Sequence, residues 1–168
     1  MTEGSRMLDL IPTGPAPAST SATPGRTEGP TCPGGMATVT HINPESLHSS
    51  PAFSWVVRVP AGADTVYVGG QNGVGPDGTV VGPGMAEQTR QALANLRTCL
   101  QAADADVIDI VKWTILYVEG ADVPAGLAAF GEFWPEDADP PAITVAKVAD
   151  VGPPGALVEI EAVAAVPR

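Results

Sequence analysis

The stretch from Val145 to Val166 constrains the fold of this chain more than any other, because it reads as two strand-like runs joined by a Gly-Pro-Pro-Gly turn. If the second run is a strand, alternation places Glu159 and Glu161 on one face and Val158 and Ile160 on the other. A sheet face that carries two carboxylates must face solvent, a partner subunit or a functional site. Which of these three holds is the functional question that the sequence raises.

The composition excludes several classes of function. The chain has 168 residues, of which 44% are hydrophobic, and 8 basic against 19 acidic residues give a net charge of −11. Such a surface repels phosphate backbones and anionic lipids, so we expect no nucleic-acid partner and no membrane partner. No run approaches the ~20 apolar residues that cross a bilayer, and the N-terminus lacks a signal-peptide pattern. We therefore expect a cytoplasmic protein.

The N-terminal part differs in composition from the rest. Residues 1–38 are rich in Pro, Gly, Ser and Thr and lack apolar periodicity, which predicts a disordered tail followed by one domain over residues 39–168. Met36, near the end of this tail, could be the start of translation. Cys32 and Cys99 form no CxxC pair or Cys/His cluster, and His41 and His48 lack ligand partners at suitable spacing. We expect no metal site and no disulfide.

Periodicity predicts alternating strands and helices over the remaining chain. Expected strands run over Phe53–Val59, Thr65–Gly69, Ile110–Val118, Ala142–Val148 and Leu157–Val166, and expected helices over Met85–Ala103 and Pro124–Trp134. We expect the first two strands to pair across a hairpin-length loop, after a loop over residues 41–51. Two helices cannot cover both faces of a five- or six-stranded sheet, which predicts an α+β fold with a mixed sheet and both helices on one face. The opposite face, which carries Glu159, is then left uncovered by helices. Burying it against other copies of the chain favours a closed homo-oligomer.

Five segments together resemble the RidA/YjgF (Rid) family: N-P-E-S-L-H-S-S-P-A-F-S-W-V-V, V-Y-V-G-G-Q, E-Q-T-R-Q-A-L-A-N-L, I-V-K-W-T-I-L-Y-V and V-E-I-E-A-V-A. Each segment is weak alone, but their joint pattern is specific and covers nearly all of the chain outside the tail. The resemblance implies a chorismate-mutase-like α+β fold and a homotrimer with three clefts between subunits. It also implies hydrolysis of reactive enamines and imines to a keto acid and ammonia, without a metal or organic cofactor.

The resemblance assigns site residues at the matching positions. The closing-strand glutamate, which helps to position water and substrate, matches Glu159. The positions that correspond to substrate-binding residues are Phe53, Gly69, Gly70, Gln71, Ile143, Thr144 and Val145. Phe53 keeps the ring of the family's common tyrosine without its hydroxyl, and Gly69 stands where the family has a serine.

The largest departure from the family pattern is at Ile143, which stands where the family has an arginine that clamps the substrate carboxylate. Arginine offers a charged, bidentate fork, whereas isoleucine offers an apolar wall. We therefore expect a substrate other than simple 2-aminoacrylate. With no arginine beside it, Glu159 could act as a general acid on an imine nitrogen or an enol, in addition to positioning water.

Three functions stay open at this point. The first is hydrolysis of imines or enamines, and the second is a biosynthetic use of the same cleft for condensation or tautomerisation. The third is a non-catalytic trimer that binds a small metabolite or a partner protein. The retained Glu159 and Gln71 favour an enzyme, whereas Ile143, Phe53 and Gly69 favour the third function because three polar groups are lost together.

Several of these residues also have purely structural explanations. Gln71 and Gln88 could bond to backbone across the fold, and Gly69 and Gly70 could form a tight exit from a strand. Gln88 is expected to lie largely off the apolar stripe of its helix. Glu161 is explained more readily as an interface residue than as a site residue.

Overall fold

The computed structural model describes residues 38–48 and 50–167, so the predicted tail lies outside the described residues apart from Thr38. The elements are β1 (Thr40–Ile42), β2 (Val56–Arg58), β3 (Asp64–Asn72), α1 (Met85–Ala102), the short 3-10 helix η2 (Val107–Asp109), β4 (Ile110–Val118), α2 (Val123–Gly131), β5 (Ala142–Val148) and β6 (Val158–Val166). Both helices and the strands from β3 onward lie where the sequence predicts them, with some ends shifted.

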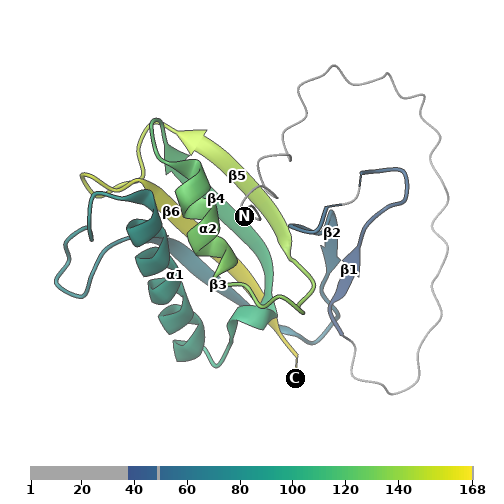
Figure 1. Ribbon diagram of the computed structural model, residues 1–168. Coiled ribbons are helices and arrows are strands. Elements are labelled where there is room, and N and C mark those ends of the chain that lie inside the picture. Colours follow the sequence, from purple (N-terminus) through teal and green to yellow (C-terminus); the bar gives the residue numbers. More distant parts are fainter. Residues whose placement is uncertain (1–37, 49, 168) are drawn as a thin grey trace, which may run out of the picture.

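The central element is a mixed four-stranded sheet with the strand order β3-β6-β4-β5 (Figure 1). Strand β6 pairs antiparallel with β3 and β4, and β4 pairs parallel with β5. A parallel pair needs a crossover connection, which the segment containing α2 provides. Helices α1 and α2 pack against each other and lie on the same side of the sheet (Figure 1). The predicted α+β fold with both helices on one face is confirmed.

The predicted pairing of the first two strands is wrong. Strand β2 pairs with β1 in a separate two-stranded sheet, with His41 opposite Val57, whereas β3 pairs with β6. The predicted loop from residue 41 therefore begins inside a short strand, and the main sheet has four strands instead of five or six. A hydrogen bond connects the segment before β2 to the segment before β5: the Ser54 hydroxyl donates to Pro140 O at 2.6 Å.

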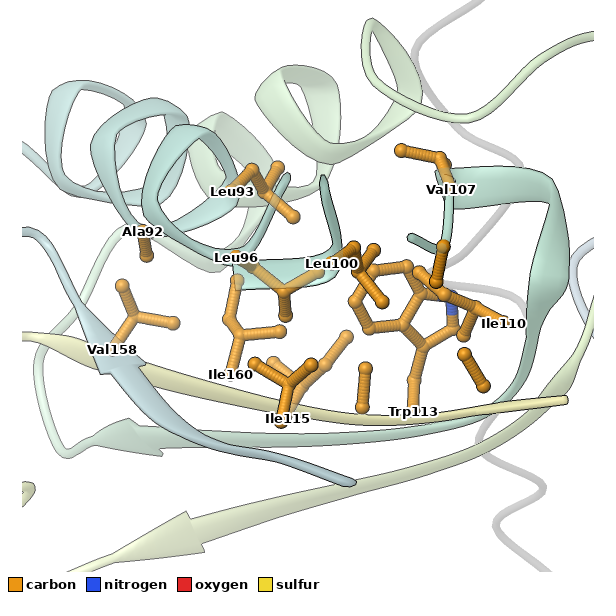
Figure 2. Packing of buried hydrophobic residues seen from close by; sticks show 14 of the residues in the cluster. Ala92, Leu93, Leu96, Leu100, Val107, Ile110, Trp113, Ile115, Val158 and Ile160 are labelled. Atoms are coloured by element: carbon orange, nitrogen blue, oxygen red, sulfur yellow. The ribbon is translucent and has the colours of Figure 1, made fainter. Parts of the chain in front are cut away.

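The core lies between α1 and the sheet (Figure 2). Leu93, Leu96 and Leu100 of α1 meet Trp113 of β4 and Ile160 of β6, and none of the five is more than 1% exposed. The three- and four-residue spacing of the leucines puts them on one side of the helix. This packing fixes α1 over the side of the sheet that Trp113 and Ile160 face.

Gln88 is the exception to the predicted helix stripe. The spacing places it largely off the apolar side, yet it is only 1% exposed. Its side-chain Nε2–H donates to Gly155 O at 3.0 Å, and its Oε1 accepts from the Leu157 backbone N–H at 2.8 Å. The amide side chain therefore bonds to backbone across the fold and holds the segment that leads into β6.

Candidate functional site

Glu159 and Glu161 project from β6 to the face of the sheet that lies opposite the helices. Along β6 the two half-buried glutamates alternate with buried apolar residues, as the sequence pattern predicts. In register, Glu159 lies opposite Asn72 of β3 and Leu116 of β4. Strands on both sides therefore hold the backbone of Glu159, which is a rigid position for a functional carboxylate.

Gly69 and Gly70 lie in an irregularity of β3 beside Glu159. The register between β3 and β6 shifts between Val68 and Gln71. A Cβ on Gly70 would stand 2.8 Å from Glu159 Cγ and closer still to the carboxylate, whereas a Cβ on Gly69 would meet nothing within 4 Å. The Glu159 side chain therefore lies against the Gly70 backbone, in a close approach that the absence of a side chain permits.

Asn72 is a neighbour of Glu159 that the sequence reasoning missed. Its side-chain amide donates to Val151 O at 2.8 Å, to Val158 O at 3.0 Å and, at the longer distance of 3.4 Å, to Glu159 Oε2. The backbone carbonyl of Asn72 in turn accepts from Asn95 of α1 at 3.2 Å. The signal that would have found Asn72 is its position opposite Glu159, which becomes visible only once the register of β3 with β6 is known.

The three predicted residues of β5 lie on two different faces. Ile143 is opposite Trp113 in the parallel register, lies on the helix side and packs against the core. Val145 shares that side, whereas Thr144 projects toward the face that carries Glu159. The structure therefore does not bring Ile143 and Glu159 together within one copy of the chain.

Lys112 supplies a positive charge on the Glu159 face that the sequence reasoning did not consider. Its ammonium donates to Thr144 Oγ1 at 2.7 Å and to the carbonyl of Trp113. Lys147, near the end of β5, pairs with Glu119 at 2.8 Å.

Partial burial lowers the pKa of Lys112 below the ordinary lysine value, and the charge of Glu161 opposes this shift. Desolvation disfavours the charged form of an amine, so the direction follows from the position of Lys112 on the sheet. We expect its ammonium to titrate below a free lysine in NMR of the isotopically dimethylated protein, assigned with a Lys112→Arg variant. A midpoint at or above the free-lysine value would mean that the Glu161 charge outweighs burial.

The remaining predicted residues separate into two places. Gln71 lies at the β3 irregularity with the two glycines, and its Nε2–H donates to Gly69 O at 3.1 Å. This is a bond to backbone within β3, whereas the structural explanation was a bond across the fold. Phe53 lies in the segment before β2, where its ring meets those of Trp55 and His48 edge-on, with centroids 5.0 and 6.2 Å away. These contacts of Phe53 therefore lie within the segment that connects β1 to β2.

The two glycines of β3 give a matched pair of substitutions. Gly70→Ala is expected to push the Glu159 carboxylate from its position, because the new methyl group needs the space that the carboxylate fills. The displaced atoms are the end of a flexible side chain, so we expect little change in thermal stability. Misplacement by about 1 Å can cost about 10²-fold in rate, so Gly70→Ala should lower turnover on that scale.

Gly69→Ala is the control for this prediction, since its methyl group meets open space. Turnover and melting temperature of both variants would be measured side by side with the wild type. Equal turnover in Gly70→Ala and Gly69→Ala would show that the Glu159 position is not needed for activity.

Comparison with known proteins relates this geometry to a family. The model of the family described as Endoribonuclease L-PSP matches residues 45–166. The chain belongs to the RidA/YjgF family. The 2-iminobutanoate/2-iminopropanoate deaminase of Rattus norvegicus is 37% identical over 114 residues, which cover 67% of this chain and 79% of that protein.

Solved structures of the RidA/YjgF family share the fold. The Rid-family protein YyfB of Yersinia pestis superposes with a TM-score of 0.68 at 33% identity, over 76% of this chain and 98% of that one. The YjgF protein of E. coli superposes with a TM-score of 0.56 at 34% identity, over 64% of this chain and 84% of that one.

Within residues 38–48 and 50–167, no group of three or more His, Cys, Asp or Glu side chains is arranged to hold a metal ion. In the same described part of the chain, no helix is both long and apolar enough to cross a bilayer.

Proposed function

We propose that this protein hydrolyses imines, or the enamines that tautomerise to them, to a carbonyl compound and ammonia, with Glu159 as the catalytic carboxylate. The observation that carries this proposal is the placement of Glu159 against Gly70 and beside Asn72, on a strand that is paired on both sides. The deaminase name of relatives at more than a third identity supports the same reaction class.

The reaction needs one group that accepts and returns a proton. The oxygen of a water molecule forms a bond to the imine carbon while its proton moves to the Glu159 carboxylate. Glu159 returns that proton to the nitrogen, which gives a carbinolamine. The carboxylate then takes the proton of the carbinolamine hydroxyl and passes it to the amino nitrogen, so that the C–N bond breaks, the C=O bond forms and ammonia leaves. No oxidant, reductant or cofactor enters this balance.

The site is completed by a second copy of the chain in this proposal. Glu159 and Ile143 lie on opposite faces of one sheet, two strands apart, so a small substrate cannot touch both within one copy. Strand β5 is the last strand of the main sheet and brings Ile143 and Val145 to its edge. We propose a homotrimer in which this edge of one copy meets the Glu159 face of its neighbour, as the family resemblance implies.

The test of the proposed function is ammonia release from imines made in situ. An amino-acid oxidase supplies imines that carry a carboxylate, and an amine oxidase supplies imines that lack one. We expect the wild type to accelerate ammonia release above the uncatalysed rate with at least one of the two classes. No acceleration with either class would overturn the proposal, and sedimentation of the same samples would test for three copies.

A second candidate is a non-catalytic trimer that binds a metabolite. Ile143, Gly69 and Phe53 favour it, because none of these side chains offers a polar group to a substrate. This candidate predicts that small molecules raise the melting temperature without any turnover. Nucleic-acid cleavage, which the family description Endoribonuclease L-PSP suggests, gains no support from a chain with a net charge of −11.

A further inference from the structure

A cavity of about 740 Å³ lies between α2, the segment that leads from α2 into β5, and the segment before β2. Ile143 forms part of its wall together with Trp113, Leu127, Phe130 and Trp134. Its size falls in the range of pockets that hold small organic ligands, and such pockets are mostly lined by apolar and aromatic side chains. The cavity therefore offers room for a ring or a branched aliphatic group beside one of the predicted substrate-binding residues.

Within the described chain, the wall of this cavity offers few hydrogen-bond donors and no positive charge to an anion. Pro51, Pro135, Pro140 and Pro141 contribute to it, and proline has no backbone N–H to donate. Glu136 is the one charged residue among the described residues that form the wall. A ligand carboxylate in this cavity would meet no positive charge and one negative charge.

None of the lysine and arginine residues of the described chain lies in the cavity wall. Arg90 pairs with Glu132 at 2.8 Å and Lys147 with Glu119 at 2.8 Å. The Arg97 guanidinium stacks 4.5 Å from the centre of a phenylalanine ring that is not part of the cavity wall. Lys112 projects from β4 to the face opposite Trp113, while Arg58 lies on β2 and outside the wall.

The polar atoms near the cavity are largely satisfied within the chain. The Trp134 indole N–H donates to Ala138 O at 3.3 Å. The carbonyl of Pro140 accepts from Ser54 Oγ, and the carbonyl of Pro141 accepts from the Ser54 backbone N–H at 3.1 Å. What remains for a ligand is apolar surface, aromatic faces, the Glu136 carboxylate and the buried Trp113 indole N–H, which has no hydrogen-bond partner within the described chain. This combination suits an apolar group with a neutral or cationic nitrogen.

We propose that this cavity binds imines and amines that carry an aromatic or branched aliphatic substituent and no carboxylate, with the substituent inside and the nitrogen toward Glu136. This inference rests on the proposed function in one respect, because it treats the molecule bound in the cavity as a substrate. Binding to the cavity itself can be measured without turnover. The inference would explain the isoleucine at position 143, where the family resemblance implies a carboxylate-clamping arginine, by a change of substrate class.

The experiment uses three probes of equal size, 4-fluorobenzylamine, 4-fluorobenzyl alcohol and 4-fluorobenzoate, whose binding to the full chain is followed by ¹⁹F NMR. We expect the amine and the alcohol to bind at least about tenfold more tightly than the benzoate, a difference of about 1.4 kcal/mol. Glu136→Gln should reduce the preference for the amine over the alcohol, and Asp137→Asn, at an exposed neighbour outside the wall, should not.

Two bulky substitutions locate the binding. Ala128→Trp adds a ring from an exposed position of α2 in the cavity wall, and Ala94→Trp adds the same ring at an exposed position of α1 outside it. Ala128→Trp should weaken amine binding by about tenfold or more, and Ala94→Trp should leave it unchanged. Benzoate binding as tight as amine binding, an unchanged affinity in Ala128→Trp, or no binding of any probe would each overturn the inference.

The outcomes separate this inference from the proposed function. Amine binding that Ala128→Trp weakens, without ammonia release from any imine, would retain the cavity and reject the hydrolase. Ammonia release from imines that carry a carboxylate alone, with no amine binding, would retain the hydrolase and reject the substrate class.

Discussion

Replacing Glu159 by glutamine is expected to lower the turnover number for ammonia release by about 10²–10⁴-fold, the usual contribution of a positioned general acid–base group. Glutamine keeps the shape of the side chain and can still accept the hydrogen bond from Asn72, but it cannot take a proton from water. Stability should change little, because Glu159 is half-buried on the face that the helices do not cover.

Glu161→Gln is the matched control for this substitution. Glu161 lies two residues further along β6 on the same face and is opposite Thr114 of β4. We expect Glu161→Gln to keep most of the turnover, because the charge of Glu161 acts on Lys112, whereas the side chain that lies against Gly70 is that of Glu159. Equal losses in the two variants would mean that the charge of the whole face matters and that Glu159 has no special role.

Trp113→Ala is expected to lower the free energy of unfolding by about 3–5 kcal/mol, the usual cost of removing a fully buried tryptophan side chain. Trp113 is 0% exposed in the middle of the core. Its ring meets those of Phe130, Phe133 and Trp134 edge-on, with centroids 5.2 to 6.3 Å away. The substitution would therefore leave a cavity between the sheet and α2, measurable by urea denaturation.

Two controls separate packing from other effects of this substitution. Trp55→Ala removes a tryptophan that is 36% exposed and should cost much less. Trp113→Phe should cost less than Trp113→Ala, because it keeps an aromatic ring in the core. It also breaks no hydrogen bond, since the buried indole N–H has no partner within the described chain. Similar midpoints and slopes for Trp113→Ala and Trp55→Ala would contradict the assignment of Trp113 to the centre of the core.

Alternation within single strands was sufficient to predict the faces of β6. When carboxylates alternate with apolar residues in a strand that has one buried face, the apolar side chains take the buried face. The carboxylates of Glu159 and Glu161 therefore lie together on the other face. The leucine stripe of α1 is equally local, and its spacing alone puts Leu93, Leu96 and Leu100 toward the sheet. Fold class followed from the order of these elements.

Relations between strands could not be predicted in the same way. Strands β1 and β2 are three residues long, too short for a periodic signal, and their pairing depends on contacts such as that of Ser54 with the chain before β5. The position of Asn72 beside Glu159 depends on the β3 irregularity, and the separation of Ile143 from Glu159 depends on the parallel register of β4 with β5.

The central claim is that imine hydrolysis takes place at a site to which two copies of the chain contribute. The most direct measurement mixes Glu159→Gln, which loses turnover, with Ala128→Trp, which loses affinity for the substrate. Ammonia release is assayed at a substrate concentration well below saturation, after the two variants are unfolded and reassembled together. A site shared between neighbours predicts recovery of about one quarter of the wild-type rate in an equal mixture, because random assembly pairs an intact cavity with an intact Glu159 at that frequency. A mixture that stays as inactive as its two parents, while wild type treated in the same way recovers, would contradict the account.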